Sequence, residues 1–380
     1  MLYCNASLAA STNSLQPLAY EEYKYAILQL TERGFATIEG RKLAMRSRES
    51  IESIKSMRMA PTRLYAFLLR LRPVQSGTLM AFSGEFVHGA FLRWLRETAP
   101  DVSMWLHDGN KRRLFTCSSL QFDWPAQRML SAERENVHLP LDPQKTYFIR
   151  ITLLLGELFP LLHEALMRYY PNPHQVTQHF LQLGKQRFTL EEVILTPSHP
   201  SGQCGFTSLT TLVEQAQQVS SHILEQVTLD FTYLTTFNRS SNTQGYGPHY
   251  ALLPLPHYVF PNLAKRWEDI APPELAGIIQ RRLIEDYTLQ DGIIITDYDL
   301  RPHRIHFTKH VQQGFVGRCT YSVRDPRASR ITNDGADEES RESGRSPLSI
   351  PQQIWLLSQL AFYSGIGYKT SMGMGRAQAV

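Results

Sequence analysis

The segments LYAFLLRL (residues 64–71) and GEFVHGAFLRWLRET (residues 84–98) decide how the regular part of this chain folds. The first combines aromatic and aliphatic side chains, which is typical of a buried strand. In the second, Val87, Phe91 and Leu95 recur at helical spacing opposite several arginines, which predicts an amphipathic helix. The pattern therefore opens with a strand followed by a helix.

Four further segments complete a unit of six elements. Residues 114–122 and 146–155 are predicted as strands, and residues 187–195 as a further strand. Residues 157–170 are predicted as a helix, because Pro160 falls in the first turn, where proline is tolerated. The order is strand, helix, strand, strand, helix, strand, which is the ferredoxin-like βαββαβ unit.

The same order recurs in the second half of the chain. The predicted elements are a strand at 226–236, a mostly helical stretch at 258–287, strands at 293–300 and 313–323, a helix at 351–363 and a strand at 371–380. We therefore expect an α+β protein with two tandem ferredoxin-like domains, at residues 61–200 and 222–380.

Two segments do not fit either domain. Residues 1–60 include a basic stretch with few large apolar side chains, so we expect a poorly ordered extension, and Met59 is a possible alternative start. Residues 324–347 are dense in Ser, Asp, Glu and Arg, so we expect a flexible insert.

Composition excludes several classes of protein. The 380 residues, 42% of them hydrophobic and 19% charged, fit two globular domains and exclude collagen-like and wholly disordered chains. The four cysteines lie far apart without a C-x-x-C spacing, so neither a zinc ribbon nor a disulfide framework is indicated. No signal peptide or membrane-spanning run is apparent, and we expect a cytoplasmic protein.

The net charge of +4 is too small for binding of nucleic acid through bulk charge, so any such function needs a local concentration of cations. Residues 301–323 and 348–380 contain no Asp or Glu. They carry six cations, Arg301, Arg304, Lys309, Arg318, Lys369 and Arg376. This imbalance predicts a surface that faces a polyanion, and the alternative is chance clustering on an ordinary solvated face.

The segment YSGIGYKTSMGMGRA at residues 363–377 is rich in glycine. Glycines allow positive φ and let backbone N–H groups approach phosphate closely. Neither the dinucleotide-binding nor the Walker spacing fits, because Thr370 and Tyr368 stand where glycines are required. The segment indicates a contact with a nucleic-acid backbone, and the alternative is a tight helix-to-strand connection.

These glycines, together with residues 84–95, 106–120 (LHDGNKRRLFTCSSL) and 253–275 (LPLPHYVFPNLAKRWEDIAPPEL), resemble the CRISPR repeat-processing endoribonucleases of the RAMP superfamily. The resemblance runs from about residue 62 onward. One departure is Tyr233-Leu234-Thr235, where similar members often have Ser-Pro-Thr.

The resemblance implies metal-independent cleavage of CRISPR precursor RNA within its repeats, with no cofactor. A 2′-hydroxyl attacks the adjacent phosphate, the 5′-oxygen leaves, and a 2′,3′-cyclic phosphate remains. His88 is the expected acid or base, because the family usually assigns that task to the histidine of this helix; the alternative is a histidine packed in the core. His107 is the second candidate, beside Asp108, although a structural turn is equally compatible with it.

Binding of the repeat RNA and retention of the mature guide RNA are the further implied functions. The predicted RNA-binding residues are Arg93, Arg96, Gly365, Gly367, Lys369, Thr370, Ser371, Gly373, Gly375 and Arg376. A metal site formed by His303, His306 and His310 is disfavoured, because strand alternation does not place all three on one face.

Partners and alternative functions remain open at this stage. The protein is expected to be a monomer or homodimer, with other CRISPR effector subunits as further partners and no membrane contact. One alternative is a catalytically silent RNA-holding subunit of an effector complex. Another is a generic RNA-binding module, which is disfavoured because the chain lacks the aromatic Lys/Arg-Gly-Phe-Gly-Phe arrangement of such modules.

Overall fold

The computed structural model describes residues 63–107, 113–170, 179–239, 249–324 and 348–380. The predictions for residues 1–60, for Met59 as a start and for nearly all of the insert at 324–347 lie outside these residues.

The first unit forms a sheet with the strand order β3-β5-β1-β7-β6. Its elements in chain order are β1 (Arg63–Pro73), α3 (Gly84–Thr98), β3 (Phe115–Cys117), β5 (Tyr147–Leu153), α6 (Leu158–Met167), β6 (Leu181–Leu183) and β7 (Gln186–Ile194). Within the βαββαβ set, the order β3-β5-β1-β7 places the second, third, first and fourth strands side by side, all antiparallel. This is the ferredoxin-like arrangement predicted from the sequence.

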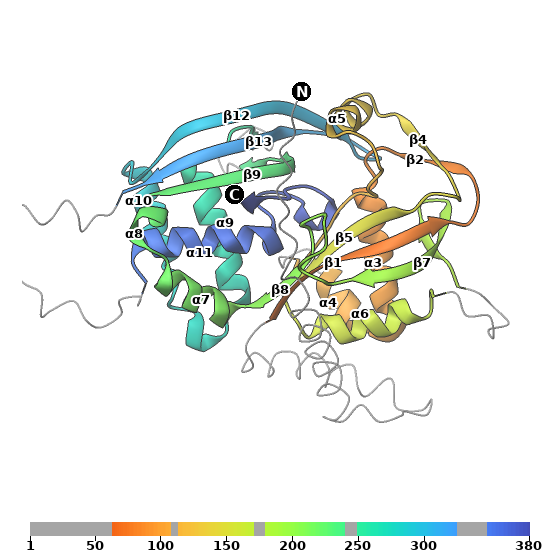
Figure 1. Cartoon of the computed structure of the whole chain (residues 1–380), viewed down its shortest axis with the longest axis horizontal. Coiled ribbons are helices and arrows are strands. Elements are labelled where there is room, and N and C mark those ends of the chain that lie inside the picture. The colour runs from red at the N-terminus through yellow and green to blue at the C-terminus, as the bar shows by residue number, and fades with distance from the viewer. Residues whose placement is uncertain (1–62, 108–112, 171–178, 240–248, 325–347) are drawn as a thin grey trace, which may run out of the picture. The chain divides into compact units, whose positions relative to one another are not determined.

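The buried side chains of α3 explain why the helix covers this sheet. Phe91, Trp94 and Leu95 have exposures of 0–1% and belong to the same core as Phe67 of β1 and Ile149 of β5. Figure 1 shows α3, α4 (Pro100–His107) and α6 on one side of the β1–β5–β7 sheet. The amphipathic pattern at residues 84–98 thus fixes which face of α3 is buried.

The second unit repeats this topology. Its elements are β9 (Gln226–Thr235), α9 (Pro256–Ile270), β12 (Ile293–His306), β13 (Val311–Val323), α11 (Ile350–Ser364) and β14 (Gln378–Ala379). The strand order β12-β13-β9-β14 again places the second, third, first and fourth strands side by side, all antiparallel. The protein therefore contains tandem ferredoxin-like folds.

Several further elements were not predicted from the sequence. They are α4, the paired strands β2 (Gly77–Met80) and β4 (His138–Leu141), α5 (Ala126–Arg134), β8 (Gly205–Ser208), α7 (Leu209–Gln218), α8 (Ser221–Leu224), the pair β10 (Phe237–Arg239) and β11 (His249–Ala251), and the one-turn helix η3 (Thr370–Met372). The long helical stretch at 258–287 divides into α9, the 3₁₀ turn η2 (Pro273–Leu275) and α10 (Arg281–Leu289), because Pro272 and Pro273 interrupt it.

Three strand predictions differ in length from the structure. The strand expected at 114–122 is confined to β3, the one expected at 371–380 is confined to β14, and β12 continues to His306 instead of ending at residue 300. The predicted start of the last strand is instead a turn, because Gly373 and Gly375 have positive φ angles of 93° and 72°.

Only part of the segments without Asp or Glu is exposed, so their lack of acids has more than one cause, and the predicted contact with a polyanion stays a prediction. Most of α11, within residues 348–380, is buried, so its lack of carboxylates reflects a core position. Arg301, Arg304, Lys309 and Arg318 of the β12–β13 hairpin are exposed, and acids from neighbouring positions, Asp299 and Asp230, pair with two of them.

Among the described residues, no helix is long and apolar enough to cross a membrane.

Candidate active site

The glycine-rich segment at 363–377 lies against the first turn of α3. Gly84 is the first residue of α3, and a Cβ atom there would lie 2.2 Å from the carbonyl oxygen of Met372. A side chain at residue 84 would therefore separate the helix from the segment. The glycine at this position brings two parts of the chain together that are nearly 290 residues apart.

Backbone conformation explains the glycines of the segment itself. Gly365, Gly367, Gly373 and Gly375 all have positive φ angles, between 61° and 93°. At Gly375 a Cβ would also lie 2.2 Å from the carbonyl oxygen of Ile366, and at Gly367 one would lie 2.5 Å from that of Thr236. These positions therefore require glycine for turning and close packing.

Three of these glycine amides donate hydrogen bonds within the protein. The N–H of Gly365 donates to the Ala361 oxygen at 2.9 Å, that of Gly367 to Asn262 Oδ1 at 3.0 Å, and that of Gly375 to the Leu234 oxygen at 2.8 Å. A phosphate contact through these amides would first require loss of these bonds. Turning and close packing therefore account for these glycines in the protein without RNA, and their contact with RNA stays a prediction.

His88 projects from α3 toward the glycine-rich segment. Its ring is 6% exposed and stacks on Phe115 of β3, with centroids 5.6 Å apart. Nδ1 lies 3.0 Å from the carbonyl oxygen of Ser371. Because a carbonyl only accepts hydrogen bonds, Nδ1 carries the hydrogen, and the neutral ring has its lone pair on Nε2.

The environment of His88 favours the neutral ring. Burial is the main cause that lowers its pKa from 6.5 to about 4; Arg113 and His107 contribute to the lowering, whereas the hydrogen bond to Ser371 opposes it. At neutral pH the ring is therefore uncharged. Nε2 forms no hydrogen bond with any residue that the structure describes, and it is available to accept a proton.

An open depression of about 680 Å³ between α3 and α4 contains four of the predicted site residues. They are His88, Arg93, Arg96 and His107, and Gly89, Leu92, Ser103 and Met104 complete the lining. Arg93, Arg96 and His107 are exposed, whereas His88 is buried at the edge of the core. The depression therefore combines the neutral imidazole of His88 with the exposed guanidinium groups of Arg93 and Arg96 and the imidazole of His107. Asp108, the expected neighbour of His107, lies outside the described residues.

The remaining predicted RNA-binding residues do not line this depression. Lys369 Nζ lies 4.1 Å from the centre of the Phe307 ring and donates to His310 Nε2 at 2.6 Å. Thr370 and Ser371 are buried. Arg376 is half-buried and donates to Thr232 Oγ1 at 2.8 Å. The structure thus brings the Ser371 backbone to His88 but directs Lys369 and Arg376 elsewhere.

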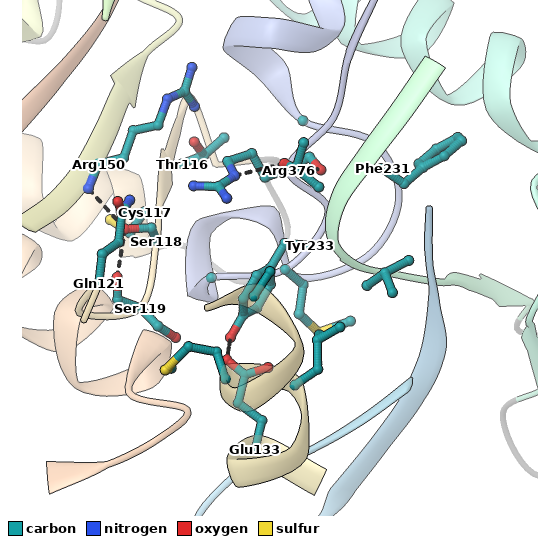
Figure 2. Close-up of a pocket in the computed structure, with 18 of the residues that line it drawn as sticks. Thr116, Cys117, Ser118, Ser119, Gln121, Glu133, Arg150, Phe231, Tyr233 and Arg376 are labelled. Carbon is teal, nitrogen blue, oxygen red and sulfur yellow. Dashed lines mark hydrogen bonds between the residues drawn. The ribbon is translucent and has the colours of Figure 1, made fainter. Parts of the chain in front are cut away.

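A second cavity, of about 370 Å³, contains Arg376 and is shown in Figure 2. Buried Arg150 of β5 also lines it, and its Nε and Nη2 donate to the carbonyl oxygens of Gln203 and Phe362 at 2.8 and 2.7 Å. Burial lowers the pKa of Arg150 to about 9. This arginine was not predicted from the sequence, because it lies inside an apolar strand.

The lining of the second cavity also includes a buried carboxylate. Glu133 of α5 accepts a hydrogen bond from the Tyr233 hydroxyl, and Figure 2 shows that hydroxyl pointing at the carboxylate. His303 Nε2 lies 2.8 Å from the other carboxylate oxygen. Among the described residues, no three His, Cys, Asp or Glu side chains are grouped closely enough to hold a metal ion.

Two arginines behind His88 were also missed. Arg113 raises the positive potential at His88, and its Nη1 donates to the Leu106 carbonyl next to His107. Arg266 of α9 is buried and donates to Thr370 Oγ1 at 2.8 Å. The Lys-Arg-Arg run at 111–113 was a visible signal for the first, but nothing in the local pattern distinguishes the second from a surface arginine.

Comparison with known proteins identifies the two halves separately. The family model described as CRISPR Cas6 N-terminal domain matches residues 63–214, and the model described as CRISPR-associated endoribonuclease Cas6 matches residues 229–377. The sequence has no significant match among curated proteins.

Solved structures give the same result for the fold. The Thermus thermophilus Cas6 (TTHB231), solved as a product complex, is 23% identical with a TM-score of 0.61, covering 83% of this chain and 100% of that one. A product complex of Cas6 (TTHA0078) is 24% identical with a TM-score of 0.53, covering 84% and 99%. Since both family models match in chain order and the tandem fold agrees, the chain belongs to the Cas6 family of CRISPR-associated endoribonucleases.

Proposed function

We propose that this protein cleaves CRISPR precursor RNA within its repeats, without a metal ion, by attack of a 2′-hydroxyl on the adjacent phosphate. Nε2 of His88 takes the proton of the 2′-hydroxyl, the 2′-oxygen bonds to phosphorus, and the bond from phosphorus to the 5′-oxygen breaks. The products are a 2′,3′-cyclic phosphate and a 5′-hydroxyl. The departing 5′-oxygen needs a proton, and the exposed imidazole of His107 is the proposed donor.

The observation that carries this proposal is the fixed orientation of the His88 ring. The Ser371 carbonyl accepts from Nδ1 at 3.0 Å, so the lone pair of the neutral ring is on the other nitrogen. A pKa of about 4 keeps that nitrogen unprotonated at neutral pH, as a general base requires. A histidine with a packing role alone would not need to border an open depression.

Charge stabilisation is assigned to the arginines of the same depression. During the attack, negative charge builds up on the non-bridging phosphate oxygens, and guanidinium groups stabilise such charge with paired hydrogen bonds. Arg93 and Arg96 are exposed on α3 one and two turns beyond His88. In this proposal they contact the scissile phosphate or its neighbours.

The second domain is proposed to hold the RNA and to retain the product. Lys369 and Arg376 are the cations of the glycine-rich segment, and neither forms a salt bridge with a carboxylate of the described residues. Two Cas6 relatives have been solved as product complexes, which supports retention of the cut RNA. The first domain would then carry out the cleavage, and the second would provide much of the affinity for RNA.

The test is cleavage of the cognate repeat RNA in EDTA, with analysis of the RNA ends. We expect one cut per repeat, a 2′,3′-cyclic phosphate end, and no cut when the attacking nucleotide is 2′-deoxy. His88→Ala should bind the RNA but not cut it. The matched control is His222→Ala, which replaces an exposed histidine on α8 and should cut like the unaltered protein. Binding without cleavage by the unaltered protein would instead favour a silent RNA-holding subunit.

A further inference from the structure

Arg266 occupies an unusual position for an arginine. It lies on α9, whose other buried residues include Phe260, Leu263 and Trp267, and it is itself only 7% exposed. Burial of a guanidinium is costly unless its N–H groups find acceptors. The groups that accept hydrogen bonds from the Arg266 guanidinium therefore indicate its structural role.

The guanidinium of Arg266 joins two segments that are distant in sequence. Nη2 donates to Thr370 Oγ1 at 2.8 Å, and Nη1 donates to the carbonyl oxygen of Arg113 at 3.2 Å. Because the guanidinium is planar and rigid, its two amino groups hold both acceptors at a fixed separation. One side chain of the second domain thus fixes a turn near residue 370 and the approach to β3 in the first domain.

Both segments act directly on His88. Ser371, the neighbour of Thr370, provides the carbonyl that accepts from Nδ1, and Phe115, two residues after Arg113, stacks on the ring. Arg113 is also the charged neighbour that disfavours protonation of the imidazole. The two acceptors of Arg266, on Thr370 and Arg113, therefore lie one and two residues away from the two residues that orient the His88 ring.

We propose that Arg266 is a positioning residue for the reaction: its fork holds the Ser371 carbonyl against Nδ1 of His88 and so keeps the neutral imidazole in the single tautomer that presents Nε2 to the depression. Arg266 does not contact RNA in this proposal. The inference rests on the proposed function of His88, but the orientation of the ring is measurable without RNA.

The first experiment reads the tautomer of His88 directly. In protein labelled with ¹⁵N-histidine, the ring nitrogen shifts of His88, assigned with His88→Gln, distinguish a hydrogen on Nδ1 from one on Nε2. We expect the Nδ1–H form in the unaltered protein and a mixture of the two forms in Arg266→Met. Arg266→Lys keeps the charge but loses the planar fork, so it should restore the single form only partly.

Thr370 provides a smaller change to the same contact. Thr370→Val removes the acceptor oxygen with little change in volume, whereas Thr370→Ser keeps it. We expect the mixture of tautomers in Thr370→Val and the single Nδ1–H form in Thr370→Ser. This pair keeps the proposal testable if Arg266→Met does not fold.

The matched control is Arg150→Met. Arg150 is also buried and also joins two distant segments through backbone carbonyls, but it lines the other cavity. This variant should unfold at a lower temperature than the unaltered protein and yet keep His88 as the Nδ1–H form. A general loosening of the fold would instead alter the tautomer in both variants.

The second experiment measures single-turnover cleavage and RNA affinity. Misplacement of the base should lower the cleavage rate of Arg266→Met by about tenfold to a hundredfold, with affinity for repeat RNA within about twofold of the unaltered protein. A single Nδ1–H form in both Arg266→Met and Thr370→Val would overturn the positioning role. If His88→Ala cuts as fast as the unaltered protein, the proposed function fails instead, whatever the tautomer.

Discussion

Two histidines are buried among the described residues, His88 and His303, and their surroundings differ in one decisive respect. Both are nearly inaccessible, at 6% and 4% exposure, and both contact residues of the other half of the chain. His88 bonds to a neutral backbone carbonyl and borders an open depression. His303 contacts the carboxylate of Glu133, which is itself 2% exposed.

The comparison separates a histidine suited to chemistry from one suited to structure. A carbonyl fixes the orientation of the ring and leaves the second nitrogen free to exchange protons with a substrate. A buried carboxylate instead requires its partners, because without them its charge is left unsatisfied away from water. Glu133 has two such partners, His303 and Tyr233, and they tie α5 to the second sheet.

The largest difference is expected in cleavage. His88→Ala should lower the single-turnover rate of folded protein about 10²- to 10⁴-fold, because general acid–base catalysis contributes that much. His303→Ala should cleave at nearly the rate of the unaltered protein per folded molecule. Quenched-flow or manual time courses with repeat RNA provide both rates. Equal losses in two folded variants would contradict the comparison.

For stability, we expect the contacts around His303 and Glu133 to matter most. Glu133→Ala removes the acceptor shared by His303 and Tyr233, so we expect a loss of about 3 kcal/mol in the free energy of unfolding. Glu135→Ala, two residues further on and exposed, is the control and should change it by less than about 0.5 kcal/mol. Urea unfolding followed by tryptophan fluorescence measures both. Equal losses for the two variants would show that the buried contacts contribute nothing.

Acidification should distinguish His88 by its depressed pKa. Between its ordinary value of 6.5 and its folded value of about 4, the unfolded chain binds a proton at this residue that the folded protein does not. The contribution of neutral His88 to the free energy of unfolding is therefore constant above pH 6.5 and is lost as the pH falls toward 4. The unaltered protein should lose more stability over this range than His88→Gln in urea titrations. Parallel curves would contradict the depressed pKa.

The smallest effect concerns two glycines of α3. Gly89 has no heavy atom within 4 Å of an added Cβ, so Gly89→Ala should raise the free energy of unfolding by about 0.5–1 kcal/mol through helix propensity. Gly84→Ala should lower it, because the new Cβ would meet the Met372 carbonyl at 2.2 Å. Thermal unfolding of the two variants shows whether each substitution stabilises or destabilises the protein. Stabilisation by both would mean that the close approach at Gly84 is easily relieved.

Much of the fold could be predicted because apolar periodicity is a local property. The predicted helix at 84–98 and the strand at 64–71 agree with α3 and β1, and the repeated six-element order together with the family resemblance predicted the tandem fold. β12 was predicted too short, because Pro302 and the charged residues around it interrupt the apolar alternation. Short elements such as α5 carry too few residues for a clear period.

The candidate site could be predicted only in part, because its contacts join distant residues. Local spacing places His88, Arg93 and Arg96 on one amphipathic helix, and the family resemblance, not the spacing, implies the catalytic role of His88. The contact of His88 with Ser371 spans 283 residues, and that of Arg266 with Thr370 spans 104. No local pattern encodes either contact, so the tautomer of His88 and the role of Arg266 required the fold.

The separation between Gly84 and Met372 also has a meaning for the order of synthesis. A ribosome makes α3 long before it makes the turn that packs against Gly84, so a nascent chain that ends before residue 371 has no carbonyl to orient the imidazole. Under the proposed mechanism, such a chain would contain the base but not the contact that orients it. The proposal therefore implies that cleavage starts only after the second domain has been synthesised and has packed against α3.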